Sequence, residues 1–244
     1  MPRPALALYT DFGTTDFYVG QMHARALAEA PDTAVVDLHH HAPTFAPGRA
    51  GLVLEALVPF LPAEAVVVGV VDPGVGTDRG TLALWSCGHW FVGPDNGLFA
   101  PLLADGGWRA HRLEVAREGA SASFHGRDIF VPAAAALARG DRMVLGAPVA
   151  EPVVVAGERA RVVYQDHYGN LMTGLEAPAS LAGQILVAGQ VIPPARTFGE
   201  VAPGALFWYR NSLDRVEIAA REASAARQLG AGPGTPVGWS RPAE

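Results

Sequence analysis

Residues 65–71 read Ala-Val-Val-Val-Gly-Val-Val, a continuous apolar run that is mostly β-branched. Such a run is typical of a strand buried on both faces of a parallel sheet. Shorter apolar runs predict strands at residues 5–9 and 34–38, and helical spacing of apolar residues predicts helices at residues 19–30 and 47–57. This alternation of strand and helix predicts an α/β fold, a layered and Rossmann-like domain with right-handed crossovers between its strands.

The second half of the chain has a different pattern. After about Gly146, short β-like runs alternate with Gly and Pro, and one short helix is predicted at residues 224–229. Closely spaced short strands of this kind indicate a small β-barrel or sandwich. We therefore expect two domains, an α/β domain in residues 1–150 and a small C-terminal β-barrel domain in residues 158–244. The strands expected in the second half lie at residues 153–155, 161–164, 184–187, 205–209, 215–219 and 236–239.

The composition limits the kind of protein and its partners. The net charge is −6 and only 17% of the residues are charged, which argues against nucleic acid because a phosphate backbone requires a basic face. Cys87 is the only cysteine, so an intrachain disulfide and a Cys-based zinc site are both excluded. The most apolar region, residues 52–71, is interrupted by two glutamates and two prolines, whereas a membrane helix needs ~20 nearly uninterrupted apolar residues. The first residues also lack the pattern of a signal peptide, and we expect a soluble, cytoplasmic protein with no membrane partner.

Polar residues follow several of the expected strands. In open α/β sheets, ligands bind beyond the carboxyl ends of the parallel strands, so these segments should meet at one edge. A further polar segment comes just before the helix that is expected to start near Pro132. The segments are Thr10–Asp16, His39–His41, Asp72–Gly76 with Arg79, Pro94–Gly97 and His125–Asp128.

Each of these segments also has a purely structural interpretation. Asp11 and Asp95 could be turn or helix-cap residues, because Asp is favoured at such positions for its backbone hydrogen bonds. Asp72 and Arg79 could form a structural ion pair, and His125 could be a satisfied interior histidine.

Three consecutive histidines, His39–His41, are typical of some metal sites. Neighbouring residues on a strand point to opposite faces, so at most His39 and His41 can converge. Two convergent ligands are too few for a closed site of the zinc type. We therefore expect no bound metal, and a metal-dependent hydrolase built on these histidines is the least favoured alternative.

Taken together, the motifs resemble those of the S-adenosylmethionine hydroxide adenosyltransferase family, which is related to the adenosyl-fluoride and adenosyl-chloride synthases. The resemblance covers nearly the whole chain, with the motifs in the same order. The matching segments are Thr10-Asp11-Phe12-Gly13 with Asp16 and Tyr18-Val19-Gly20; Val71-Asp72-Pro73-Gly74-Val75-Gly76 with Arg79; Pro94-Asp95-Asn96-Gly97; His125-Gly126-Arg127-Asp128-Ile129-Phe130; Asp166-His167-Tyr168-Gly169-Asn170-Leu171; and Asn211-Ser212.

The resemblance implies roles for residues of both domains. Asp72, Arg79 and His125 occupy the positions of the set that handles the attacking water, which makes the first domain the catalytic one. It also implies that Asp11 accepts hydrogen bonds from the ribose hydroxyls and that Phe45 lies near the ribose. In the second domain, which would complete the substrate site, Asp166 would face the methionine ammonium, Asn170 the adenine edge and Ser212 the methionine carboxylate. The other substrate-binding positions by resemblance are Asp16, Asp95, Asn96, Tyr168 and Asn211.

The implied reaction is the cleavage of S-adenosylmethionine by water to adenosine and methionine. No cofactor is expected, because the sulfonium is already a good leaving group and what remains is to position and activate the oxygen nucleophile. The resemblance also implies a homotrimer whose sites pair the first domain of one subunit with the second domain of a neighbour.

Two alternatives remain open from the sequence. An adenosyl-halide synthase has the same fold, but those relatives lack the Asp–Arg–His set. A protein that binds S-adenosylmethionine or adenosine without turnover would not need that set either. The chain also departs from the halogenating relatives at Leu213, where they often have Arg, so the carboxylate would rest on Ser212 and backbone donors or on Arg215.

Overall fold

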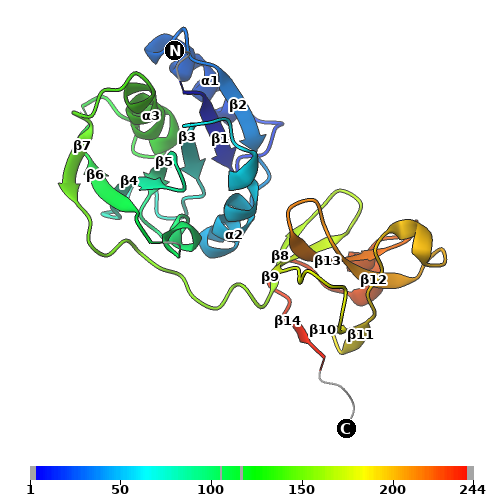
Figure 1. The fold of residues 1–244 in the computed structure, drawn as a ribbon. Coiled ribbons are helices and arrows are strands. Elements are labelled where there is room, and N and C mark those ends of the chain that lie inside the picture. The colour runs from blue at the N-terminus through cyan, green and yellow to red at the C-terminus, as the bar shows by residue number, and fades with distance from the viewer. Residues whose placement is uncertain (1–3, 105, 116–117, 241–244) are drawn as a thin grey trace. The chain divides into compact units, whose positions relative to one another are not determined.

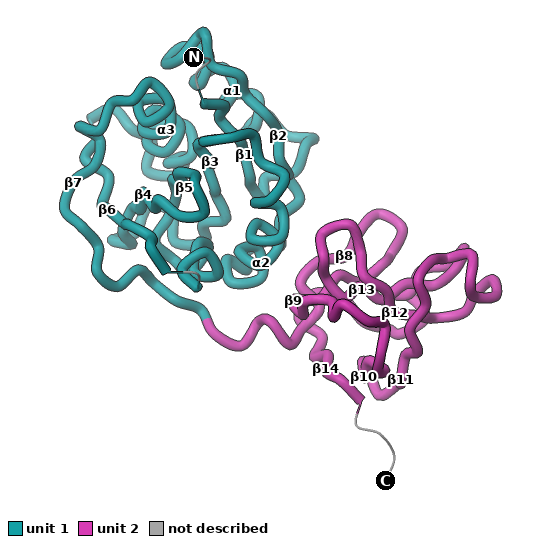
Figure 2. The backbone as a smooth tube through the Cα atoms, in the orientation of Figure 1, with its two compact units in different colours: residues 1–155 teal, residues 156–244 magenta. Residues whose placement is uncertain are grey.

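The structure is a computed structural model that describes residues 4–104, 106–115 and 118–240. The chain divides into two compact units, the first ending at Val155 and the second beginning at Ala156 (Figure 2). None of the helices in the described ranges is long and apolar enough to cross a membrane.

The first unit contains a seven-stranded mixed sheet in the order β2-β1-β3-β5-β4-β6-β7 (Figure 1). Strands β2, β1, β3 and β5 run parallel to one another. Strands β4, β6 and β7 continue the sheet in antiparallel pairing. The strands are β1 (Leu6–Thr10), β2 (Val35–His39), β3 (Val66–Val70), β4 (Thr81–Ser86), β5 (His89–Pro94), β6 (Arg109–Leu113) and β7 (Leu145–Pro148).

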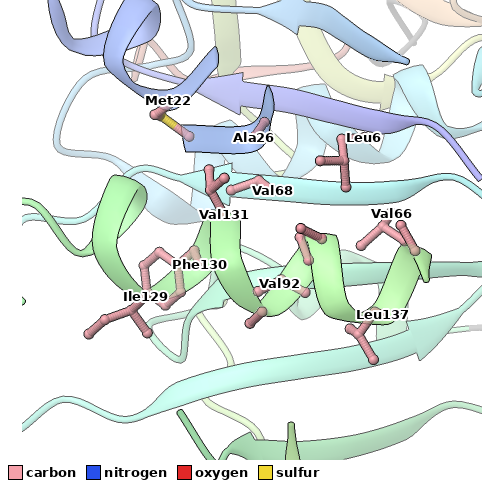
Figure 3. Packing of buried hydrophobic residues seen from close by; sticks show 14 of the residues in the cluster. Leu6, Met22, Ala26, Val66, Val68, Val92, Ile129, Phe130, Val131 and Leu137 are labelled. Carbon is pink, nitrogen blue, oxygen red and sulfur yellow. The ribbon is translucent and has the colours of Figure 1, made fainter. Parts of the chain in front are cut away.

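Helices cover both faces of this sheet. Leu6 and Leu8 of β1 are fully buried in one cluster with Met22 of α1 and with residues of α3 (Figure 3). Tyr9 has the opposite orientation, and its hydroxyl donates a 2.7 Å hydrogen bond to the Ala50 carbonyl of α2. Because consecutive strand residues point to opposite faces, α2 lies on the other side of the sheet from α1 and α3. The helical segments are α1 (Tyr18–Glu29), α2 (Pro47–Leu57), η1 (Val58–Phe60), η2 (Ala100–Leu103), the π-helix η3 (Gly126–Phe130) and α3 (Val131–Ala138).

The predicted α/β layered fold is confirmed, and its antiparallel part is an addition that the sequence did not indicate. Strand β4 returns to β5 through Cys87 and Gly88, both of which have positive φ (52° and 79°). A two-residue turn with positive φ at both positions matches the right-handed twist of the strands that it joins, so β4 and β5 form a tight hairpin.

The strand predicted at residues 153–155 is wrong. The Val153 amide donates a 2.9 Å hydrogen bond to the carboxylate of Asp95 rather than to a neighbouring strand. Val155 lies over Gly97, where an added Cβ would come within 2.3 Å of the valine side chain. The segment is therefore held to the first unit as a coil, despite its β-branched composition.

The second unit is built from two antiparallel sheets, in the orders β12-β13-β9-β8 and β11-β10-β14. The sheets are joined at both edges by isolated bridges, Arg161 with Pro236 and Pro194 with Trp208. The strands thus form a closed ring, and the predicted small β-barrel is confirmed. The elements are β8 (Val162–Gln165), β9 (Leu171–Glu176), β10 (Ile185–Val187), β11 (Gln190–Ile192), η4 (Phe198–Glu200), β12 (Leu206–Arg210), β13 (Arg215–Ala220), α4 (Ala225–Leu229) and β14 (Val237–Trp239).

The interior of this barrel is apolar. Trp208 is fully buried and packs edge-on against Trp239, with ring centroids 5.2 Å apart. The short helix α4 is defined at both ends, since the Ser224 hydroxyl accepts a hydrogen bond from the Arg227 amide and Gly230 ends the helix in the left-handed conformation.

Candidate active site

The loops that follow the parallel strands carry the polar residues of the first unit. Asp11 follows β1 and Asp72 follows β3, so both lie at the carboxyl edge of the sheet. Strand β4 is antiparallel to β5 and pairs Thr81 with Pro94, so β4 starts at that same edge. Arg79, two residues before β4, is thereby placed beside Asp72.

Asp72, Arg79 and His125 form one contact set. The Arg79 Nε lies 2.9 and 3.0 Å from the two Asp72 carboxylate oxygens, and Nη2 also bonds to Oδ2. The same Nη2 lies 2.9 Å from His125 Nδ1. Both charged side chains are largely withdrawn from water, at 10% exposure for Arg79 and 4% for Asp72.

The contact with Arg79 fixes the tautomer of His125. A guanidinium has only donors, so His125 Nδ1 must accept and the neutral ring carries its proton on Nε2. The guanidinium also lies over the Phe130 ring, 5.3 Å from its centroid, which favours a cation at this point. Arg79 is therefore held by a carboxylate, an imidazole and an aromatic face together.

The segment that carries His125 is anchored by the next two charged residues. Arg127 donates from Nε and Nη2 to both carboxylate oxygens of Asp128, at 2.7 Å each. Its Nη1 bonds to Gln21 of α1 at 2.5 Å, and Asp128 accepts the Ser121 amide at 2.9 Å. These bonds stabilise the loop and the π-helix η3 that follows His125, and single-turn π-helices are frequent at functional sites.

A cavity of about 370 Å³ opens beside this contact set. Asp11, Phe45, Asp72 and His125 line it, together with apolar side chains such as Phe124. Burial and, to a lesser extent, the charge of Asp72 raise the pKa of Asp11 above its ordinary value, although the Phe45 amide donates to its carboxylate. Phe45 itself has a φ of 56°, a strained conformation for a residue with a side chain and one that is often found at binding sites.

Three of the predicted substrate-binding residues do not line this cavity. Asp16 lies in an exposed turn. The Asp95 carboxylate bonds to Arg112 at 2.7 Å as well as to the Val153 amide. The Asn96 amide donates to the Val71 carbonyl and accepts from the Leu98 amide, so its polar atoms serve the loop itself.

A second and larger cavity, of about 1020 Å³, lies in the second unit. All five of the predicted residues of this unit line it, namely Asp166, Tyr168, Asn170, Asn211 and Ser212. Asp166 and Asn170 flank the turn between β8 and β9, where the Asn170 side-chain amide donates to Asp166 at 2.8 Å. The Asn170 backbone amide donates to the other Asp166 oxygen, so the turn presents the two side chains as a pair.

Three further residues of this cavity were missed by the sequence analysis. Tyr209, Glu217 and Arg227 all line it, and Glu217 accepts hydrogen bonds from the Tyr209 hydroxyl and the Asn211 amide. Glu217 lies inside the strand run Arg-Val-Glu-Ile-Ala-Ala, where alternation alone would not distinguish it from a surface glutamate. Arg215, one of the two options for the substrate carboxylate, does not line the cavity and lies 3.5 Å from Glu176 instead.

The described ranges contain no cluster of three or more His, Cys, Asp and Glu side chains that could hold a metal ion. The buried member of the histidine run, His40, bonds to the Thr10 hydroxyl at 2.9 Å. The rings of His39 and His41 are 6.2 Å apart between centroids.

The fold and the two cavities define a class of protein with an α/β domain followed by a small barrel. Comparison with protein families gives a matching pair of domains: the SAM hydroxide adenosyltransferase N-terminal domain over residues 6–145 and the corresponding C-terminal domain over residues 160–238. The chain belongs to the SAM hydroxide adenosyltransferase family, as the motifs indicated.

Similar proteins include an (R)-S-adenosyl-L-methionine hydrolase from Thermus thermophilus, 40% identical over 96% of this chain and 98% of the relative. A protein of the same name from Salinispora tropica is 39% identical over 96% of each chain. Among solved structures, a conserved protein from Thermotoga maritima has a TM-score of 0.87 at 27% identity, over 97% of this chain and all of that one. A second, from Thermus thermophilus, has a TM-score of 0.80 at 38% identity over the same shares.

Proposed function

We propose that this protein is an enzyme that hydrolyses (R)-S-adenosyl-L-methionine to adenosine and L-methionine. The observation that carries the proposal is the Asp72–Arg79–His125 contact set beside a cavity that is also lined by Asp11. Membership of the family and the names of the similar proteins support the same substrate.

The reaction is a displacement at the 5′ carbon of the substrate. The water oxygen forms a bond to C5′ while the C5′–S bond breaks, its electron pair neutralises the sulfonium, and one proton is released. Arg79 does not itself line the cavity but bonds to Asp72 and His125 in its wall. From behind these side chains its guanidinium favours the deprotonated oxygen, because a positive charge lowers the cost of forming the anion. Asp72 orients Arg79 for this role, and His125 contributes its Nε2–H as a donor at the cavity wall.

We propose that the second unit binds the rest of the substrate. Asp166 would accept from the methionine ammonium, Asn170 would contact the adenine edge, and Tyr168, Asn211 and Ser212 would complete the wall. In the first unit, Asp11 and Phe45 would contact the ribose. Of the remaining candidates, Asp16, Asp95 and Asn96 have less support, because they line neither of these two cavities.

The reaction can be tested directly with purified protein that has been treated with EDTA. We expect adenosine and methionine to form from the (R) epimer in heavy-oxygen water, with the label at the 5′ oxygen of adenosine. An Asp72→Asn variant serves as the matched control and should form almost none. Unlabelled adenosine would contradict a direct displacement by solvent water.

The halide-synthase alternative is tested in the same assay with chloride or fluoride added. Halide use requires a niche that strips water from the anion, whereas the contact set here presents charged and hydrogen-bonding groups. We expect adenosine to remain the product at high salt. A halogenated adenosine as the main product would place the protein among the synthases.

We also propose a homotrimer in which the first unit of one subunit and the second unit of its neighbour share a site, the first unit being the catalytic domain. The support is that the candidate residues fall into two compact units and must meet one small ligand. A cytoplasmic location is likewise a proposal, in keeping with a substrate made inside cells.

A further inference from the structure

Glu217 is a buried carboxylate that the mechanism above does not use. It lies on β13 in the wall of the second unit's cavity and is 9% exposed. Its Oε1 accepts the Tyr209 hydroxyl at 2.5 Å, and its Oε2 accepts the Asn211 side-chain amide at 2.8 Å. Burial raises the pKa of Glu217, while these two hydrogen bonds oppose the rise. A buried carboxylate is costly to keep unless hydrogen bonds satisfy it, and Glu217 depends on these two partners.

The hydrogen bonds of Oδ1 fix the orientation of the Asn211 side-chain amide. Asn211 Oδ1 accepts the backbone amides of Leu213 and Arg215, at 3.0 Å each. Its Nδ2 must therefore be the atom that faces Glu217, and every polar atom of the side chain is engaged. Asn211 is thus held between the turn that follows it and the carboxylate on β13.

That turn, residues 211–215, connects β12 to β13 and contributes to the cavity wall. The backbone amide of Asn211 donates to the Arg215 carbonyl at 3.0 Å, and Asp214 has a φ of 58°. Ser212 and Leu213 line the cavity from this turn. The turn has further contacts, from the Asp214 amide to the Asn211 carbonyl at 3.1 Å and from Arg210 to the Asp214 carboxylate at 2.7 Å. Asn211 links the turn to Glu217 on β13, so its hydrogen bonds help to place Ser212.

We propose that Glu217 is a positioning residue for substrate binding. It fixes the Asn211 amide, and through it the 211–215 turn, so that Ser212 and the Tyr209 ring are preset for the amino-acid end of the substrate. The inference rests on the proposed function and adds to it a residue that acts without touching the substrate. Its effect should fall on the Michaelis constant, since the candidate catalytic residues are in the other unit.

The test exchanges the donor and the acceptor of this pair. Glu217→Gln leaves one acceptor oxygen for the two donors, Asn211 and Tyr209, and Asn211→Asp places two acceptors face to face. Each single variant should raise KM for the substrate at least tenfold, with kcat changed less than threefold. The double variant Asn211→Asp/Glu217→Gln keeps the net charge and all four hydrogen bonds, because the new carboxylate can accept from the new amide and from the turn. It should recover most of the loss in KM.

Three controls separate positioning from a general loss of charge or of fold. Glu176→Gln removes a glutamate from the adjacent strand that does not line the cavity, and it should leave KM unchanged. Thermal unfolding of each variant shows whether the fold is intact. Hydrogen exchange of the Leu213 and Arg215 amides, followed without substrate, should accelerate in the single variants and slow again in the double variant.

Two results would overturn the inference. One is a double variant as impaired as Glu217→Gln alone, which would mean that the charge of Glu217 acts on the substrate directly. The other is a folded Glu217→Gln protein with unchanged KM and unchanged exchange of the turn amides. Because the exchange measurement needs no turnover, a wild-type protein that fails to hydrolyse the substrate would contradict the proposed function and leave the positioning role to be decided by exchange.

Discussion

Arg79 is the residue on which the contact set of the first unit depends. It touches both of the others, donating to Asp72 and to His125 through the same Nη2. Its planar fork cannot be reproduced by an ammonium group, although the charge can. The residue scale therefore offers a way to separate charge from geometry.

Arg79→Lys should lower kcat by at least about 100-fold, the loss expected when one preorganised group for transition-state charge is removed. Substrate affinity should stay within about tenfold, because the contacts with the rest of the substrate are unchanged. Steady-state kinetics and calorimetric binding would measure the two effects. Arg25→Lys, in a surface pair with Glu29 on α1, is the matched control and should leave both values unchanged. A Lys variant as active as the wild type would remove Arg79 from the proposed mechanism.

We expect the Asp11 carboxylate to lower the stability of the folded protein at neutral pH while it contributes to activity. Its pKa is raised in the folded protein, chiefly by burial, so folding disfavours its ionised form. The stability that a raised pKa confers is present at low pH and is lost as the pH rises through the folded value. Asp11→Asn should therefore raise the Tm at pH 7 and make no difference near pH 3. The same variant should lose kcat/KM, because the ribose hydroxyls need an ionised acceptor. A lower Tm at pH 7 would contradict the assignment.

In the loop that leads into η3, the pKa of Asp128 is shifted in the opposite direction from that of Asp11. The hydrogen bonds from Arg127 outweigh burial and lower the pKa of Asp128, so its carboxylate stabilises the fold when it is ionised. This contribution is present above the unfolded pKa and is lost as the pH falls through the folded value.

Asp128→Asn should destabilise the protein by about 2 kcal/mol at pH 7, the scale of hydrogen bonds to a charged group. The difference from wild type should shrink below pH ~4, the ordinary range of an aspartate. Denaturant unfolding at several pH values would measure it. Asp214→Asn, in an exposed pair with Arg210, is the control and should show no shift in midpoint. If the variant and the wild type differed in unfolding free energy by the same amount down to pH 2, the ion pair of Asp128 with Arg127 would not be the cause of the destabilisation.

The elements differ in how far the sequence could predict them. The apolar run at residues 65–71 became β3, and helix α2 has the predicted bounds, because one period dominates each segment. Strand β6, Arg-Ala-His-Arg-Leu, has polar residues at three of its five positions and gains its place by pairing with β4 on one side and β7 on the other. A strand of this kind depends on contacts that a single sequence does not contain.

The candidate site shows the same limit. The sequence indicated Asp72, Arg79 and His125, and the structure brings them together because strand order places their loops at one edge. Asp95 had an equally suggestive position, yet its partner is Arg112 on another strand. Glu217 carried no signal, since its role arises from two partners on β12 and the turn that follows it.

At the scale of the whole molecule, the candidate residues are divided between two units. Asp72 and its partners belong to the first, and Asp166 with the barrel residues belongs to the second. In the proposed homotrimer, a working site takes each set from a different subunit. Two chains that are each defective in one unit can then supply one intact site between them.

Asp72→Ala and Asp166→Ala should each be nearly inactive alone. Unfolded, mixed in equal amounts and refolded together, they should regain a substantial part of the wild-type activity. In mixed trimers, some sites combine the intact first unit of the Asp166→Ala chain with the intact second unit of the Asp72→Ala chain. Hydrolysis of the substrate, measured against wild type carried through the same refolding, gives the recovered fraction.

If each site were contained in one chain, every site in the mixture would carry one lesion, whatever the assembly. Activity would then stay at the level of the single variants, while the refolded wild type recovered. Mixing the two folded variants without denaturant separates subunit exchange from refolding and should restore activity only as fast as trimers dissociate. An inactive mixture would contradict the shared site if the refolded wild type is active and light scattering detects trimers in both samples. This result would leave the proposed chemistry of Asp72, Arg79 and His125 unaffected.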